Sequence, residues 1–577
     1  MRFIFYILNI LLMLLEINTI YAKVTCNIEI FCTGPILHTV QMSNVLNSSK
    51  EFVDMKLKYP EATIKRNFES IDKENKKSIK DFVDKNFEIV KSEYLDDIPS
   101  DWSDSPPFLE TIKSGQLRNL AGKIHKMWRN HSKKINPQVK NSKQSYSLIY
   151  LPNPVILPGG MFREFYYWDT YWIVVGLLVS GMFDTVKAMM KNFKELIGTY
   201  GYIPYGGRVY LTATSNPPMF VPMIYEIFKY TKDEQFLDEY FPIMERELSY
   251  WEENKSKDVP NFGKKYFLYI LDEEVPRPQE YAHDYTHAKN FSEEDMKDFY
   301  SEMWSATESG WCFSSRWYIT KDGPNSGTKL NTKVRSIIPV DLNAFMCGNY
   351  RIISKLYEQR GLPVEAKKFR HKFWKMKRAV KEAFWHEDLG IWLDYDMLND
   401  KRRDYFYASN LLPLWARCYE KNETETLVAS ILRYLNSYKI TNYKGGVPAS
   451  LFESGEEWDL PNTYPHVMHL IIVGMNKTHI PIAKHLAFAM ARQWLKYSLR
   501  AFNKDQKMHA RYNAVRPGRR GTGATYHLKG GYGWTNGALM DIIFKYRNID
   551  FTSVSCKKNI SKVFTLMVGV CVFLVNR

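Results

Sequence analysis

The sequence lacks the short motifs that mark the commonest metal, nucleotide and nucleic-acid sites. It has no zinc-finger spacing, no P-loop and no clear nucleic-acid signature. The net charge of +16 is not gathered into one block either, because Lys and Arg alternate with Asp and Glu over most of the chain. The densest basic run, residues 367–385, has apolar residues at helical spacing and is interpreted as an exposed helix. We therefore expect no metal, no cofactor and no nucleic-acid partner.

Cysteine is scarce, with seven residues in a chain of 577. Cys26 and Cys32 lie close together and are able to close a small loop, as expected of a protein from an oxidising compartment. Cys571 lies near the C-terminus. The other four are scattered, and the sequence leaves open whether each is free or paired: Cys312, Cys347, Cys418 and Cys556.

The N-terminal segment has the pattern of a signal peptide. Residues 1–22 begin with Arg2, continue through an apolar run, and place Ile20 and Ala22 at positions suited to cleavage. Sequons for N-glycosylation fit the same secretory route. There are seven: Asn47, Asn130, Asn254, Asn290, Asn422, Asn476 and Asn559. The mature chain is expected to begin near Lys23 and to be secreted or held at the extracellular face of the plasma membrane.

The apolar run at the other end, residues 563–575, is shorter than the about 20 residues that cross a bilayer. Ser553, Ser555 and a polar spacer precede it, which is the arrangement of a lipid-anchor signal. We therefore expect residues 551–577 to form a tail with an anchor signal; plain secretion is the alternative.

The body of the chain has the period of helices. Apolar residues recur at helical spacing in 170–201, 220–254, 341–361, 365–385, 412–437 and 483–504, with Gly/Pro/aromatic loops between them. Helix pairs joined by such loops predict one all-α toroid with its site at the loop-bearing mouth. Length alone would allow about four domains of about 150 residues. We instead expect one domain, residues 23–550, in which the stretch to about residue 145 is a helical decoration.

Six segments carry a resemblance to a known family. They are "PGGMFREFYYWDTYW", "PRPQEY", "ESGWCFSSRW", "IIPVDLNAF", "GGVPASLFESGEEWDLPNTYP" and "YGWTNG". In this order they resemble the signature blocks of the trehalases, inverting glycoside hydrolases that split α,α-trehalose into glucose. The stretch that starts at Cys26 is similar to the N-terminus of animal trehalases. The resemblance implies an (α/α)6 barrel and a disaccharide ligand.

Both catalytic positions of that family are substituted. Inverting hydrolysis needs a carboxylic acid to protonate the leaving oxygen and a carboxylate, about 6.5 to 9.5 Å away, to activate water. The resemblance places Cys312 at the acid position and Thr525 at the base position. A thiol has a pKa near 8.5, and threonine cannot act as a base toward water near neutral pH. Each role contributes about 10²- to 10⁴-fold, so we predict that hydrolysis is impaired or lost.

The residues that would hold the sugar are partly kept. The resemblance implies substrate-binding roles for Phe162, Tyr166, Trp168, Asp169, Arg208, Arg277, Gly310, Arg316, Trp458, Asp459 and Trp534. Substitutions stand at Met161, Tyr205, Thr214, Asn216, Gln279 and Glu457, where the family has Arg, Asn, Arg, Gln, Glu and Gln. Neither Met nor Thr reproduces the rigid donor fork of an arginine. The pocket is therefore expected to be remodelled, although any single ring is equally able to be a packing residue of the barrel mouth.

Three functions remain open. The first, which we favour, is a pseudoenzyme that binds a sugar or a partner without efficient hydrolysis. The second is a working trehalase in which another carboxylate, such as Glu308 or Asp341, replaces the missing ones. The third is a surface interaction protein that does not use the cleft. Likeness of fold alone does not establish activity.

Overall fold

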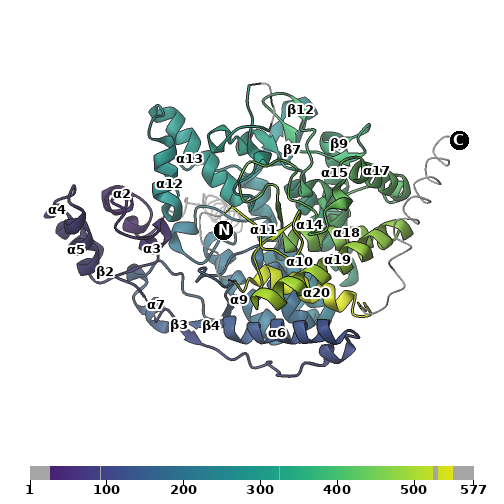
Figure 1. Cartoon of the computed structure of the whole chain (residues 1–577), viewed down its shortest axis with the longest axis horizontal. Coiled ribbons are helices and arrows are strands. Elements are labelled where there is room, and N and C mark those ends of the chain that lie inside the picture. The colour runs from purple at the N-terminus through teal and green to yellow at the C-terminus, as the bar shows by residue number, and fades with distance from the viewer. Residues whose placement is uncertain are drawn as a thin grey trace, which may run out of the picture.

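The computed structural model describes residues 26–90, 92–321, 323, 325–523, 530–549 and 551. Within them, six helices form a closed ring: α8 (Asp169–Val179), α10 (Phe220–Thr231), α14 (Val340–Gln359), α16 (Leu412–Ala416), α18 (Pro465–Lys477) and α20 (Gly533–Lys545). Each contacts the next, and α20 returns to α8. An outer layer consists of α6 (Gly115–His131), α9 (Phe183–Tyr200), α11 (Glu234–Asn254), α15 (Pro363–Phe384), α17 (Thr424–Ser437) and α19 (Pro481–Asp505) (Figure 1). The predicted all-α (α/α)6 toroid is confirmed.

The two layers differ in their apolar pattern. Every residue of α8 is buried, as expected for a helix that is apolar on all sides. In α9, one stripe is buried and the other face is exposed. The predicted segment 220–254 divides where Lys232 adopts a left-handed conformation and Asp233 caps α11 by accepting a hydrogen bond from the backbone N–H of Phe236 at 2.9 Å. Sequence periodicity therefore identifies helices of both layers but not α6, α18 or α20, and local capping sets the breaks.

The remaining elements lie in the connections, and all of them except α13 are short. The helices are α7 (Pro137–Asn141), α12 (Tyr281–Ala288) and α13 (Glu293–Glu308). Two small antiparallel sheets have three strands each: β3 (Tyr94–Asp96), β4 (Ser132–Ile135) and β5 (Val155–Ile156) form one, and β8 (Ile337–Ile338), β11 (Tyr395–Asp396) and β12 (Lys401–Arg402) form the other. Three antiparallel pairs are β6 (Ser256–Val259) with β7 (Lys264–Phe267), β9 (Trp385–His386) with β10 (Ile391–Trp392), and β13 (Asn462–Thr463) with β14 (Tyr512–Asn513).

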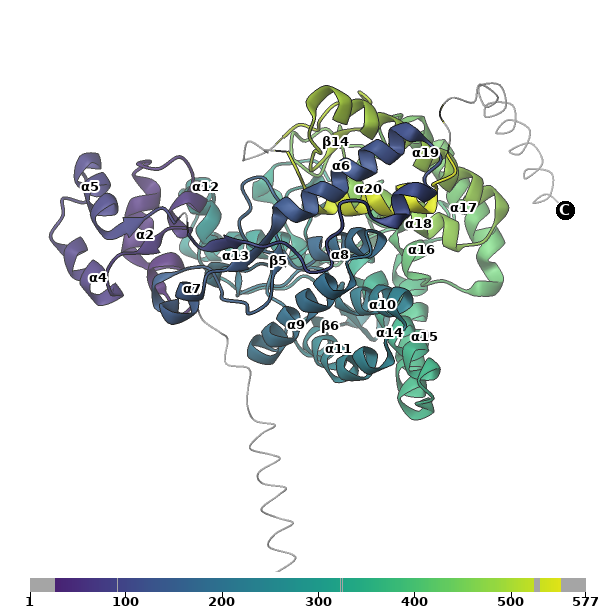
Figure 2. The same ribbon diagram turned by 90° about the horizontal axis from the view of Figure 1, so that it is seen from below.

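Residues 26–90 form an N-terminal unit with a core of its own. It contains α2 (Gly34–Met42), α3 (Ser49–Val53), α4 (Glu61–Glu69), α5 (Lys76–Asn86) and the pair β1 (Lys56–Leu57) and β2 (Phe87–Glu88). Its core also takes in Tyr210, Leu211 and Tyr281 from the barrel. Both views show the unit beside α12 (Figure 2). The unit therefore packs on barrel loops. The decoration expected from the sequence ran to about residue 145, but α6 within that stretch belongs to the outer layer of the barrel.

Two disulfides tie local segments together. Cys26 bonds Cys32, as the short spacing predicts, and Cys347 of α14 bonds Cys418 just after α16. Cys556 and Cys571, together with the expected signal peptide and the tail beyond Phe551, lie outside the described residues. None of the helices in the described ranges is both long enough and apolar enough to cross a bilayer.

Closure of the ring depends on two glycines. A Cβ on Gly537 of α20 would lie 1.7 Å from the backbone oxygen of Trp172 in α8, and a Cβ on Gly176 would lie 2.7 Å from the Cα of Gly537. Real Cβ atoms do not approach backbone atoms so closely, so any side chain at either position would separate the first and last inner helices.

We expect Gly537→Ala to lower the free energy of unfolding by about 3 kcal/mol or more, because two backbones have to move apart to admit the methyl group. Urea denaturation measures the change. Gly198→Ala in α9 is the matched control: its Cβ meets nothing within 4 Å, and its helix propensity gains up to about 1 kcal/mol. Equal stability of the two variants would contradict the close approach of α8 and α20.

Candidate functional site

A cavity of about 490 Å³ is the main candidate site. Three inner helices begin at it, since Asp169 is the first residue of α8, Tyr464 precedes α18, and Tyr532 and Trp534 flank the start of α20. The position agrees with the prediction of a site at the loop-bearing mouth. The lining includes Lys50, Phe162, Tyr166, Trp168, Asp169, Tyr205, Tyr210, Leu211, Arg277, Gln279, Glu280, His283, Thr307, Gly310, Cys312, Phe313, Lys329, Gly455, Glu456, Glu457, Trp458, Tyr464, Ala510, Arg511, Tyr532 and Trp534.

Many residues chosen from the sequence meet in this cavity. They are Phe162, Tyr166, Trp168, Asp169, Arg277, Gly310, Cys312, Trp458 and Trp534, with the substituted positions Tyr205, Gln279 and Glu457. Gly310 is needed where it stands, because its φ is +72° and a Cβ there would lie 2.8 Å from the ring of Trp168. The structure thus brings together residues that are more than 350 positions apart in the chain.

Two groups of aromatic rings contribute to the cavity wall. In the first, Trp458 stacks on Trp311 at 4.5 Å and on Tyr464 at 3.6 Å between ring centroids. In the second, Tyr166 makes edge contacts with Phe162 at 5.3 Å and with Tyr205 at 5.4 Å. Rings that are braced by other rings and present a free edge or face to a cavity are suited to cover the apolar faces of a ligand.

Two of the arginines expected to bind substrate do not line the cavity. Arg316 is fully buried and pairs with Asp341 at 2.7 Å and Asp394 at 2.8 Å. Arg208 is also fully buried and binds both oxygens of Glu93, at 2.8 and 2.9 Å. These bidentate pairs occupy the donors that a ligand would need.

The other residues expected to bind substrate or catalyse that are absent from the lining either bond to other protein groups or lie elsewhere. Asp459 accepts hydrogen bonds from Ser314 and Ser450 at 2.9 and 2.6 Å. Thr214 and Asn216 are buried beside Glu308, and half-buried Met161 is not part of the lining. Thr525 lies outside the described residues. The substrate-binding roles of Asp459, Thr214, Asn216 and Met161, and the base position at Thr525, stay predictions without a place in the described cavity.

The surrogate carboxylates suggested by the sequence are not in the lining. Glu308 pairs with Lys255 at 2.8 Å and is fully buried, and Asp341 is held by Arg316. The carboxylates that do line the cavity are Asp169, Glu280, Glu456 and Glu457. These four are therefore the carboxylates placed to act on a ligand in the described cavity.

Cys312 is the free cysteine of the described residues, so the alternative in which it forms a disulfide is wrong. Burial raises the pKa of its thiol to about 12; the nearby Arg277 guanidinium opposes the shift and Glu457 adds to it. The thiol therefore keeps its proton throughout the neutral range. It is a far weaker acid than a carboxylic acid at the same place.

Arg277 is the cation that lies close to this thiol. Its Nε and one terminal nitrogen donate to the carboxylate of Asp284 at 2.7 and 2.6 Å, and the other terminal nitrogen donates to Thr307 at 3.0 Å. The planar guanidinium also lies over the ring of Phe313 at 4.9 Å. It is thus fixed in direction before any ligand binds, which is the sense in which binding sites are preorganised.

Sequence reasoning missed several cavity residues. Arg511 donates to Glu457 at 3.3 Å, and Tyr464 lies inside the recognised block that ends "WDLPNTYP". Lys50 comes from the N-terminal unit, which the sequence presents only as decoration. The block points to Tyr464, but no local signal marks Arg511 or Lys50 as a cavity residue.

Asp169 is a buried carboxyl group that pairs with no cation among the described residues. It is 9% exposed, and burial raises its pKa to about 7, against an opposing hydrogen bond from its own backbone N–H. Across the ranges that the structure describes, no cluster of His, Cys, Asp or Glu side chains is able to hold a metal ion.

Comparison with known proteins identifies the class and then the family. The solved structure of yeast neutral trehalase Nth1 superimposes with a TM-score of 0.55 at 18% identity, covering 68% of this chain and 73% of that one. The trehalase family model matches residues 44–547. Curated trehalases of Apis mellifera and Homo sapiens are 40% and 36% identical to this chain, each over 90% of it, and over 84% and 90% of their own lengths. The chain belongs to the trehalase family.

The buried Asp169 predicts a pH-dependent contribution to stability. Its folded pKa of about 7 is above its unfolded value, so the folded chain holds an extra proton between about pH 4 and 7. Stability is therefore lost as the pH rises through this window, by up to about 4 kcal/mol. The Asp169→Asn variant cannot ionise there, so its unfolding free energy relative to the native chain should rise from pH 5 to pH 8 in urea titrations.

The matched control is Asp184→Asn, an exposed aspartate in the first turn of α9. Its difference from the native chain should stay flat over the same pH range. A flat difference for Asp169→Asn as well would contradict a buried, readily protonated carboxyl group in the cavity.

Proposed function

We propose that this trehalase-family protein binds α,α-trehalose or a related disaccharide in the cavity and does not hydrolyse it efficiently. One observation carries the proposal: a cavity walled by rings and carboxylates faces, at the position of the family's acid, a thiol that stays protonated. The curated relatives are named trehalases, which supports the ligand class.

The chemistry of the reaction supports the loss of turnover. Departure of the glycosidic oxygen requires a proton from a group that is acidic enough to give it up in the transition state. A thiol whose pKa is about 12 gives up that proton poorly. The position that the resemblance assigns to the base carries Thr525, whose hydroxyl cannot activate water near neutral pH. The expected loss is large, although two catalytic roles need not multiply.

The binding wall supports retention of a sugar. The stacked Trp458 and the edge-braced Phe162 and Tyr166 offer apolar surface, while Asp169 and the pair of Glu457 and Arg511 offer acceptors and donors at its margin. Sugars present both kinds of surface, with axial C–H groups on their faces and hydroxyls around their edges. A disaccharide therefore fits the chemistry of this wall better than an apolar ligand of similar size.

Residual hydrolysis is the second candidate, and the carboxylates of the lining favour it. Asp169 is able to hold a proton near neutral pH, and Glu280, Glu456 and Glu457 line the same cavity. In this case the pH–rate profile would show two titrating groups although Cys312 and Thr525 are not carboxylates.

The first test measures trehalose binding by calorimetry and glucose release at equal folded concentration. We expect saturable binding by the native chain and a rate of glucose release at least about 10²-fold below that of the Cys312→Asp/Thr525→Glu double variant, because restoring both carboxylates restores both proton transfers. The control is Cys312→Ala/Thr525→Ala, which should bind and should not turn over.

Each other outcome contradicts part of the proposal. Turnover by the native chain that persists in the double-alanine control would show that a lining carboxylate does the chemistry. Absence of binding, with glucose release by none of the variants, would mean that the cavity takes a different ligand, or that the protein acts through an exposed surface and not through the cleft.

We also propose that the protein passes through the secretory pathway and acts outside the cell, secreted or anchored by its C-terminal tail. The apolar segment of residues 1–22 suggests it, and the two disulfides are typical of an oxidising compartment. Six of the sequon asparagines fall in the described ranges, and all six are exposed: Asn47, Asn130, Asn254, Asn290, Asn422 and Asn476.

Expression in animal cells should therefore give a glycoprotein whose mass falls in several steps on peptide N-glycosidase treatment, because exposed sequons are accessible to the glycosylation machinery. Mass spectrometry of the intact chain measures the steps. Asn290→Gln should remove one step and no more. A mass that the enzyme leaves unchanged would count against the secretory route.

A further inference from the structure

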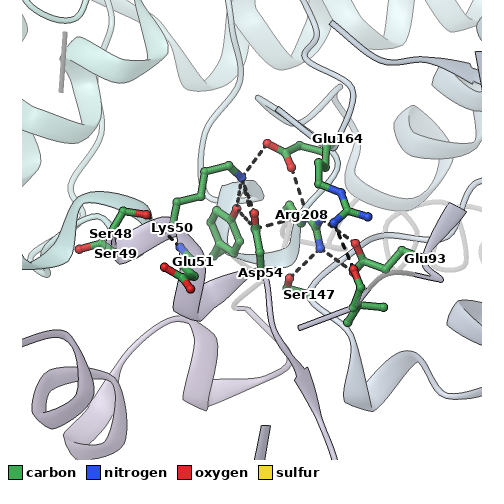
Figure 3. A network of polar contacts seen from close by, with 12 residues as sticks. Ser48, Ser49, Lys50, Glu51, Asp54, Glu93, Ser147, Glu164 and Arg208 are labelled. Carbon is green, nitrogen blue, oxygen red and sulfur yellow. Dashed lines mark hydrogen bonds and ion pairs between the residues drawn. The ribbon is translucent and has the colours of Figure 1, made fainter. Parts of the chain in front are cut away.

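Lys50 reaches the ligand cavity from outside the barrel. It belongs to α3 of the N-terminal unit, where Ser48 caps the helix by accepting a hydrogen bond from the backbone N–H of Glu51 at 3.3 Å. Its side chain is 5% exposed and forms part of the cavity lining. Figure 3 shows its ammonium group directed toward Glu164 and Asp54.

Two tyrosines of the cavity wall depend on the same contacts. Lys50 donates to the hydroxyl of Tyr210 at 2.9 Å, and that hydroxyl donates to Asp54 at 2.7 Å. Lys50 also donates to Glu164 at 2.9 Å, and the Tyr166 hydroxyl donates to the same carboxylate oxygen. One ammonium group thus fixes the hydroxyl ends of two cavity-lining rings, that of Tyr210 directly and that of Tyr166 through Glu164.

The network continues into the barrel through Arg208. Its Nε donates to Glu164 at 3.2 Å, and its terminal nitrogens bind Glu93 (Figure 3). All of these charged groups are buried except Asp54, whose side chain is 21% exposed. Lys50 and Arg208 hold the pKa of the Asp54 carboxyl below its usual range, against burial. Among the described residues, Lys50 and Arg208 are the cations that pair with Asp54, Glu93 and Glu164, so loss of Lys50 would leave negative charge under the cavity wall.

We propose that Lys50 is a positioning residue of the ligand cavity. It holds Tyr166 and Tyr210 in place and closes the wall on the side of the N-terminal unit, so residues 26–90 are part of the binding site. Other contacts fix the unit to the same mouth, since His38 bonds the Tyr281 hydroxyl at 3.1 Å and the unit's core includes Leu211. The identity of the ligand in this inference rests on the proposed function, whereas the contacts of Lys50 do not depend on it.

The test compares Lys50→Met, Lys50→Arg and the control Lys56→Met in the full chain. Lys56 lies in the same unit and pairs with Glu88 at the surface, away from the cavity lining. Two readouts are used: the Kd for trehalose, and the rate at which iodoacetamide alkylates Cys312, followed by peptide mass spectrometry. The alkylation rate needs no sugar: Cys312 lies in the same cavity as Lys50, so the rate reports how well the cavity wall shields the thiol.

We expect Lys50→Met to weaken trehalose binding about tenfold, the effect of losing one charge-assisted contact, and to speed alkylation of Cys312 several-fold. Lys50→Arg should recover most of both values, because it keeps the charge, and Lys56→Met should match the native chain. Lys50→Met/Asp54→Asn removes one charge of each sign and should behave like Lys50→Met; it replaces that variant if Lys50→Met fails to fold.

Native values of both readouts in a folded Lys50→Met or double variant would overturn the inference. So would an equal change in Lys56→Met, which would indicate a general effect on the N-terminal unit. If the native chain binds no trehalose, the proposed ligand fails, and the alkylation rates alone decide whether Lys50 positions the cavity wall.

Discussion

The contact between α8 and α20 is the constraint on which the site depends. These are the first and last inner helices, and the ring closes because Gly176 and Gly537 let their backbones touch. Closure brings the start of α20, with Trp534, beside the start of α8, with Asp169, although they are separated by most of the chain. The N-terminal ends of helices carry partial positive charge, so this end of the ring suits ligands rich in oxygen.

A second set of buried interactions holds the loops above the ring. Arg316 and Asp459 stand in recognised family blocks, and the resemblance also implies a binding role for Arg208; each of the three is used to bind other protein groups. Their geometry gives these residues a structural role that does not depend on catalysis. Loss of any one would leave buried charges or hydroxyls without partners and would displace the walls of the cavity.

The cavity therefore separates two properties that an active glycosidase combines. The shape and polarity of the cavity depend on aromatic rings, loops and ion pairs, and most of those that the resemblance implies are present in this chain. Proton transfer depends on single groups, and at Cys312 burial moves the thiol further from acidity. If Cys312 stands at the acid position, as the resemblance implies, the wall around it is kept while the proton donor is not, which is the physical basis for proposing binding with little turnover.

The sequence by itself determined the helical toroid, the approximate extents of nine of the twelve barrel helices that the structure describes, and the blocks that meet at its mouth, because these follow from periodicity and local motifs. It also indicated the loop closed by Cys26 and Cys32. Only the tertiary structure decided that Arg208 and Arg316 are used internally, that Glu308 and Asp341 lie outside the cavity lining, that Cys312 is free, and that Lys50 reaches the cavity. The reason is physical: which donor meets which acceptor depends on distances between segments far apart in the chain, and neither residue type nor spacing encodes those distances.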